Sequence, residues 1–153
     1  MKKTRVLFVC VHNSARSQIA EAFFNRYAPE KFEALSAGLE AGTLNPFVVE
    51  AMREVGIDIS KNKTKDVFDF FKQGQLFSYV ISVCDKTAAE RCPIFPGATI
   101  RLHWPFDDPG KFFGPKEEVL RRTRSVRDAI ETKVKAFIEV INNGQGFDTK
   151  DQF

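Results

Sequence analysis

Long hydrophobic runs are missing from this sequence. No apolar stretch approaches the ~18 residues that a membrane-spanning helix needs, and the first one is too short and too soon polar for a signal peptide. An excess of one charge is also missing, because 23 Lys and Arg stand against 20 Asp and Glu, for a net charge of +3. Small basic sets such as Lys61, Lys63 and Lys65 are typical of solvated faces. We therefore expect a cytoplasmic protein that binds neither a membrane nor nucleic acid.

Cysteine and histidine are scarce as well, with three and two residues in the chain. Cys84, Cys92 and His103 lack the paired spacing of a zinc site, and nothing in the sequence predicts a tightly bound cofactor. In the cytoplasm the three cysteines start reduced, so any disulfide among them is expected to be catalytic rather than structural.

Length and periodicity predict a single α/β domain over residues 1–153. The chain is 43% hydrophobic and long enough to bury one sizeable core. Short β-forming runs alternate with helical periodicity, which is typical of a parallel sheet with helices on both faces. The expected strands span 6–9, 31–36, 79–83 and 98–102. Helices are expected after the first strand, from Asn45 to Gly56, around 67–77, and from Pro115 to about 143, with a loose tail from about 144.

The most informative stretch is 10–17, Cys-Val-His-Asn-Ser-Ala-Arg-Ser, which joins the first strand to a helix. At such a junction backbone N–H groups and the positive end of the helix dipole point at one spot, where a phosphate-sized anion fits. Arg16 can fold its planar donor fork over that spot and bind two oxygens of a tetrahedral oxyanion. The same positive field favours the thiolate of Cys10, a candidate nucleophile. The residues expected to surround the anion are Val11, His12, Asn13, Ser14, Ala15, Arg16 and Ser17.

Two adjacent aspartates, Asp107 and Asp108, lie in a proline-bracketed loop after the fourth predicted strand. Parallel strands place their carboxyl ends at one edge of the sheet, so this loop, Cys10 and Cys84 are expected to converge there. Chemistry at an oxyanion needs a proton donor, because an unprotonated oxide is too basic to leave. One of the two aspartates is therefore a candidate general acid.

The loop formed by Cys10, five further residues, Arg16 and Ser17 resembles that of the low-molecular-weight protein tyrosine phosphatases and of the arsenate reductases that share their fold. The resemblance extends from Arg5 to about residue 142. It implies a four-stranded parallel sheet and a Cys10 nucleophile. It also implies that Asp108, directly before Pro109, is the general acid.

The other two cysteines separate these activities. The segment from Cys84 to Cys92 resembles the resolving segment of the thioredoxin-coupled arsenate reductases. By that resemblance Cys10 attacks arsenate, Cys84 attacks Cys10 and releases arsenite, and Cys92 attacks Cys84. Thioredoxin or another thiol reductant then restores the thiols. The polar surroundings of Cys92 favour an accessible thiol.

Two alternatives stay open. A phosphatase acting on phosphotyrosine or small phosphate esters needs only Cys10, Arg16 and Asp108, although the aromatic residues usual after Asp-Pro in that branch are replaced here by Gly110 and Lys111. A non-catalytic oxyanion-binding or redox-sensing domain is the other alternative, and it leaves Asp108 without a role.

The resemblance also implies a monovalent cation, potassium, which would brace the anion loop. Its expected ligands are Asn13, Glu21, Ser36 and Asp66. Two positions depart from the family pattern. Ala15 stands where many relatives have a second cysteine, and the interval of seven residues between Cys84 and Cys92 is one longer than in comparable reductases.

Overall fold

The computed structural model describes residues 3–97 and 99–143, and within them four strands form one parallel sheet in the order β2-β1-β3-β4. The strands are β1 (Thr4–Cys10), β2 (Phe32–Gly38), β3 (Tyr79–Ser82) and β4 (Ile100–His103). The helices are α1 (Arg16–Tyr27), α2 (Pro46–Glu54), α3 (Val67–Lys72), α4 (Lys86–Ala89) and α5 (Lys116–Asn142), with a 3₁₀ turn η1 at Pro109–Lys111. The predicted four-stranded parallel sheet is confirmed.

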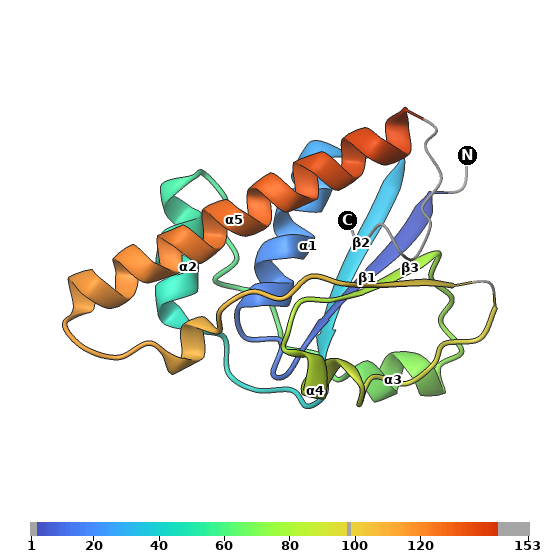
Figure 1. Cartoon of the computed structure of the whole chain (residues 1–153), viewed down its shortest axis with the longest axis horizontal. Helices are drawn as coiled ribbons and strands as arrows, with labels where there is room; N and C mark the ends of the chain where they lie inside the picture. Colours follow the sequence, from blue (N-terminus) through green and yellow to red (C-terminus); the bar gives the residue numbers. More distant parts are fainter. Residues whose placement is uncertain (1–2, 98, 144–153) are drawn as a thin grey trace.

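Helices lie on both sides of this sheet. α5 packs against α1 and α2, and in Figure 1 these three helices lie to the upper left of the strands, while α3 and α4 lie below. The burial of strand β1 shows that both faces of the sheet are packed against other elements. Val6, Leu7, Phe8 and Val9 are all fully buried, although alternate side chains of a strand point to opposite faces.

The boundaries of strand β2 and helix α3 differ from the predicted ones. β2 continues to Gly38 instead of ending at 36, because it pairs with β1 as far as Cys10. α3 ends at Lys72, shortly before Gly74, whose φ of 69° lies in the left-handed region that a helix cannot continue through. The predicted loose tail from about 144 lies outside the described residues.

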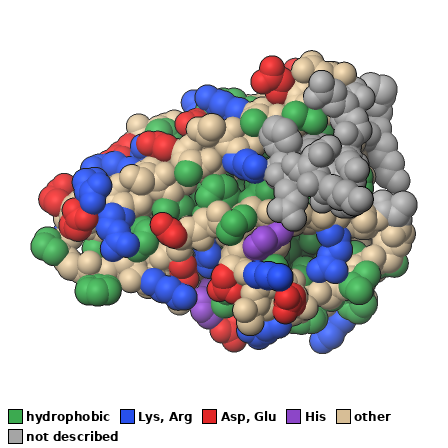
Figure 2. Space-filling view, viewed as in Figure 1, with side chains coloured by type: hydrophobic (Ala, Val, Ile, Leu, Met, Phe, Trp, Pro, Cys, Tyr) green, Lys and Arg blue, Asp and Glu red, His purple; other side chains and the backbone are tan. Residues whose placement is uncertain are grey.

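Charged side chains on the face shown in Figure 2 alternate in sign, with Lys and Arg interspersed among Asp and Glu. This mixture fits the small net charge of the chain. None of the helices in the described part of the chain combines the length and the apolar character needed to cross a membrane.

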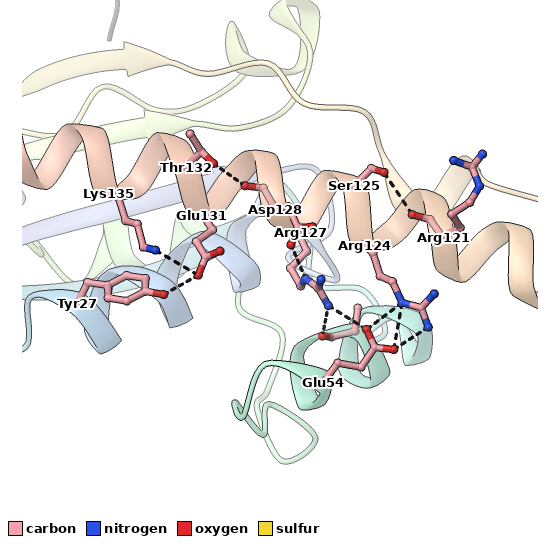
Figure 3. A network of polar contacts seen from close by, with 11 residues as sticks. Tyr27, Glu54, Arg121, Arg124, Ser125, Arg127, Asp128, Glu131, Thr132 and Lys135 are labelled. Atoms are coloured by element: carbon pink, nitrogen blue, oxygen red, sulfur yellow. Dashed lines mark hydrogen bonds and ion pairs between the residues drawn. The ribbon is translucent and has the colours of Figure 1, made fainter.

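A buried arginine fastens α5 to α2 (Figure 3). Arg127 donates to the backbone oxygen of Ala51 at 2.8 Å, to Glu54 Oε1 at 2.9 Å and to Asp128 Oδ1 at 2.8 Å. Its side chain is only 10% exposed. Arg124 from the same helix makes a second, more exposed pair with Glu54.

We expect the substitution Arg127→Met to lower the free energy of unfolding by about 2–3 kcal/mol, because it leaves the buried Ala51 oxygen without this donor and removes one of the two arginines that pair with Glu54. Urea denaturation followed by circular dichroism measures the change. The matched control is Arg121→Met, which removes an exposed arginine paired with Glu118 on the same helix and is expected to change stability little. Equal losses in the two variants would contradict a special role for Arg127.

Candidate active site

The junction between β1 and α1 holds the sulfur of Cys10 in a polar cradle. Cys10 Sγ accepts a hydrogen bond from the backbone N–H of Asn13 at 3.2 Å and is hydrogen-bonded to Ser17 Oγ at 2.8 Å. α1 begins at Arg16 without a side-chain cap, so the first N–H groups of the helix are available to an anion beside the sulfur. Of the predicted loop residues, Val11 and Ser14 are half-buried, His12 is exposed, and Asn13, Ala15, Arg16 and Ser17 are buried.

The buried side chain of Asn13 holds this loop in place through hydrogen bonds. Its φ of 56° lies in the left-handed region, which asparagine tolerates better than most residues. Its Nδ2 donates to Ser17 Oγ at 2.7 Å, and its Oδ1 accepts from Gln18 Nε2 at 3.0 Å and from the backbone N–H of Lys65 at 2.9 Å. Both contacts of the Cys10 sulfur thus depend on how Asn13 is held.

The segment after β2 wraps around the outside of the loop. A Cβ at Gly38 would lie 2.7 Å from the backbone N of Asn13 and the carbonyl carbon of His12, so the two backbones can approach this closely only because residue 38 is glycine. The backbone N–H of Glu40 donates to the oxygen of Val11 at 3.0 Å. Glu40 Oε1 also lies 3.1 Å from His12 Nδ1, which directs the His12 ring toward the rim.

The predicted acid loop reaches the anion loop through Arg16. Arg16 donates to the backbone oxygen of Phe106 at 3.2 Å, and its other terminal nitrogen lies 3.5 Å from Asp108 Oδ2. Asp108 also caps the turn η1 by accepting from the Gly110 N–H at 2.8 Å. Asp107 is exposed. The tertiary structure therefore distinguishes the two aspartates, and it directs Asp108 to the site.

Cys84 follows β3 and is fully buried. Burial raises the pKa of its thiol to about 11, the negative charge of Cys10 adds to the rise, and the guanidinium of Arg16 opposes it. The backbone N–H of Val83 donates to the oxygen of Val9 at 2.8 Å, so Cys84 and Cys10, the next residue in each segment, lie at the same edge of the sheet. Two of the three cysteines therefore share one site.

Cys92 does not join them. Burial raises its pKa to about 11 as well, with Arg101 as the charge acting on it. The thiol borders a cavity of about 660 Å³ together with Ser82 and His103, whose Nδ1 is 2.8 Å from Ser82 Oγ. The short helix α4 lies in the chain between Cys84 and Cys92.

The prediction that Cys92 is an accessible thiol is wrong, because its side chain is only 6% exposed. The neighbouring Ile94 is 74% exposed instead. Phe95 explains the exchange, since its ring packs edge-on against Phe71 and Phe77 and anchors the turn. That anchor turns Cys92 inward and leaves Ile94 at the surface.

The family model of the low molecular weight phosphotyrosine protein phosphatases matches residues 5–146. The chain belongs to this family. Among its relatives, an arsenate reductase of Shouchella clausii is 43% identical over 141 residues, which cover 91% of this chain and 98% of that protein.

Solved structures of family members are also similar to this chain. An arsenate reductase in its oxidized state matches with a TM-score of 0.75 and 30% identity, covering 90% of this chain and 98% of that one. The thioredoxin-dependent arsenate reductase of Corynebacterium glutamicum matches with a TM-score of 0.68 and 28% identity, covering 94% of this chain and 64% of that one. The resemblance noted in the sequence is thereby confirmed.

The family resemblance implies a potassium ion bound by four residues. As they lie in this structure, these residues do not fit such an ion. Asn13 Oδ1 already accepts two hydrogen bonds, and Asp66 Oδ1 accepts from the Phe68 N–H at 2.8 Å as the cap of α3. Glu21 Oε1 accepts from Ser36 Oγ at 3.2 Å and faces Lys65 Nζ at 3.7 Å. Within residues 3–97 and 99–143 no cluster of three or more His, Cys, Asp or Glu could hold a metal ion.

Sequence reasoning missed two residues that support the loop. Gln18 is fully buried and connects Asn13 to the backbone oxygen of Lys63 and to Asn62. A polar side chain on the buried face of an amphipathic helix was the available signal. Lys65 is the other. Its side chain is 31% exposed, so it is partly solvated as expected, but its ammonium group also pairs with Glu21.

Proposed function

We propose that this protein reduces arsenate to arsenite by a relay of three thiols, Cys10, Cys84 and Cys92. The observation that carries the proposal is the position of Cys84, which directly follows Val83, the donor of a 2.8 Å hydrogen bond to the residue before Cys10. A phosphatase requires a nucleophile, an arginine and an acid, and has no need of a second thiol at that position. The names of the relatives support the same activity.

In the first step the thiolate of Cys10 attacks the arsenic of arsenate, and one arsenate oxygen leaves as water. The N-terminus of α1 and the fork of Arg16 bind the remaining oxygens. Asp108, 3.5 Å from Arg16, donates the proton that the departing oxygen needs. Ser17 and the Asn13 N–H stabilise the thiolate before the attack.

In the second step the thiolate of Cys84 attacks the sulfur of Cys10. A Cys10–Cys84 disulfide forms, the sulfur–arsenic bond breaks, and its electron pair stays on arsenic, which leaves as arsenite.

In the third step Cys92 attacks Cys84, which frees Cys10 and leaves a Cys84–Cys92 disulfide. Because α4 separates Cys84 from Cys92 in the chain and lines the same cavity as Cys92, this step requires α4 and its flanking turns to rearrange. Two electrons from an external dithiol then restore both thiols, and we propose thioredoxin as that partner, after the thioredoxin-dependent relative. A relay that starts from reduced thiols suits a cytoplasmic enzyme.

The raised pKa of Cys84 predicts a pH dependence. Its thiol is protonated at neutral pH, and the thiolate fraction increases up to its pKa of about 11. We therefore expect the single-turnover rate of arsenite release to rise between pH 7 and 9, by up to about tenfold per pH unit where this ionisation limits the rate. Quenched-flow measurement with the fully reduced protein checks this, and a flat profile would contradict it.

A thiol count in a single turnover tests the function itself. Fully reduced protein, freed of reductant, is incubated with excess arsenate or with phosphate, and free thiols and arsenite are quantified together. We expect arsenate to remove two thiols per chain and to yield one arsenite, with no change in phosphate. Intact thiols together with hydrolysis of an aryl phosphate would instead identify a phosphatase in which Cys10 works alone.

A further inference from the structure

Lys65 lies where the backbone of the anion loop is supported. Its N–H donates to Asn13 Oδ1 at 2.9 Å, and its carbonyl oxygen accepts from the Gly38 N–H at 2.8 Å. Its Nζ lies 3.7 Å from Glu21 Oε1. The residue therefore contacts the loop, the end of β2 and helix α1 at once.

The carboxylate of Glu21 requires a positive charge beside it. The carboxylate is only 16% exposed, and burial raises its pKa despite the opposing charge of Lys65 and the hydrogen bond from Ser36. A buried carboxylate needs a nearby positive charge, and removing its partner leaves a costly unpaired ion. Apart from Lys65, no cation of the described residues is within ion-pair distance of Glu21.

We infer that the ammonium group of Lys65 is a built-in cation that braces the anion loop, in place of a bound monovalent ion. The connection to the nucleophile is short. Lys65 holds Asn13 through its backbone, Asn13 holds Ser17 at 2.7 Å, and both Asn13 and Ser17 contact the Cys10 sulfur. Lys65 is thus a positioning residue for the oxyanion site.

This inference rests on the proposed function only in taking the Cys10 loop as an anion site, so its test uses binding of inorganic phosphate and not arsenite release. Calorimetry gives the phosphate affinity of the reduced full-length protein in potassium chloride and in choline chloride at equal ionic strength. For the unmodified protein we expect the same affinity in both salts. Severalfold tighter binding in potassium would overturn the inference, because it would show that an ion is bound already.

The substitution Lys65→Met removes the ammonium group and keeps an unbranched side chain. We expect phosphate affinity to fall at least about tenfold in choline chloride and to recover in potassium chloride, where the ion can enter beside Glu21. A purely structural role would lower stability without any response that depends on the cation. The matched control is Lys61→Met, an exposed lysine of the same segment, which should leave affinity unchanged in both salts.

The double variant Glu21→Gln with Lys65→Met covers the case in which the single variant does not fold. It buries no unpaired charge, so it should fold, bind phosphate more weakly than the unmodified protein and show no response to potassium. In choline chloride, phosphate affinity equal to that of the unmodified protein, in either the single or the double variant, would overturn the inference.

Discussion

Replacing Cys84 by serine is expected to abolish arsenite formation while phosphate binding at the Cys10 loop persists. A serine hydroxyl cannot attack the Cys10 sulfur and form a disulfide with it, as a thiolate does. The arsenic bound to Cys10 therefore receives no electron pair and is not released as arsenite. Folding should be preserved, because serine is slightly smaller than cysteine and Cys84 is not engaged in a disulfide. Arsenite measured after incubation with arsenate and a dithiol gives the result. Unchanged arsenite production would disprove the relay.

The variant Cys92→Ser is the matched control, since it removes the other buried thiol and leaves Cys84 beside Cys10. One arsenite per chain should still be released, after which the protein stops as a Cys10–Cys84 disulfide that mass spectrometry of peptides can identify. Continued turnover with thioredoxin would show that the reductant attacks the first disulfide directly and that Cys92 is dispensable.

Replacing Asp108 by asparagine has the second largest expected effect. Asparagine has nearly the same shape and still caps η1 through its side-chain oxygen, but it cannot donate an acidic proton to the departing oxygen. Positioned general acids contribute about 10²- to 10⁴-fold to a rate, and we expect a loss of that size in kcat. Phosphate affinity should be retained, because Arg16 and the N–H groups of α1 remain in place.

Asp107→Asn provides the control for this prediction. Asp107 is the adjacent carboxylate, in the same loop and with the same charge, but it is exposed, whereas Asp108 lies 3.5 Å from Arg16. Steady-state kinetics of the two variants should therefore differ by orders of magnitude. Similar losses in both would mean that the charge of the loop, and not one positioned acid, supports the reaction.

The local sequence pattern was enough to predict the architecture, which the structure confirms, and to name Cys10 as the candidate nucleophile. The buried run of β1 followed by Cys10, a polar loop and a helix predicted a strand, an anion-binding junction and a nucleophile from twelve consecutive residues. Side chains within one such stretch are positioned by the backbone geometry of the strand and the helix. Convergence of Cys84 and the aspartate loop on the same edge followed from the parallel order of the strands.

The supports of the loop could not be predicted in this way. Lys65 has the same local surroundings as Lys61 and Lys63, and only its contact with Glu21, 44 positions earlier in the chain, distinguishes it. Cys92 stands in a polar stretch, and the packing of Phe95 against Phe71 and Phe77 decides that its thiol is buried.

By itself the sequence determined the fold class, and it predicted the nucleophile and the oxyanion loop, because each of these depends on residue types at short spacing along one or two elements. Only the tertiary structure decided which aspartate meets Arg16, that Cys84 adjoins Cys10 while Cys92 is held apart, and that a lysine stands beside Glu21. Those outcomes depend on contacts between segments far apart in the chain, where burial and charge are set by neighbours that local periodicity does not specify.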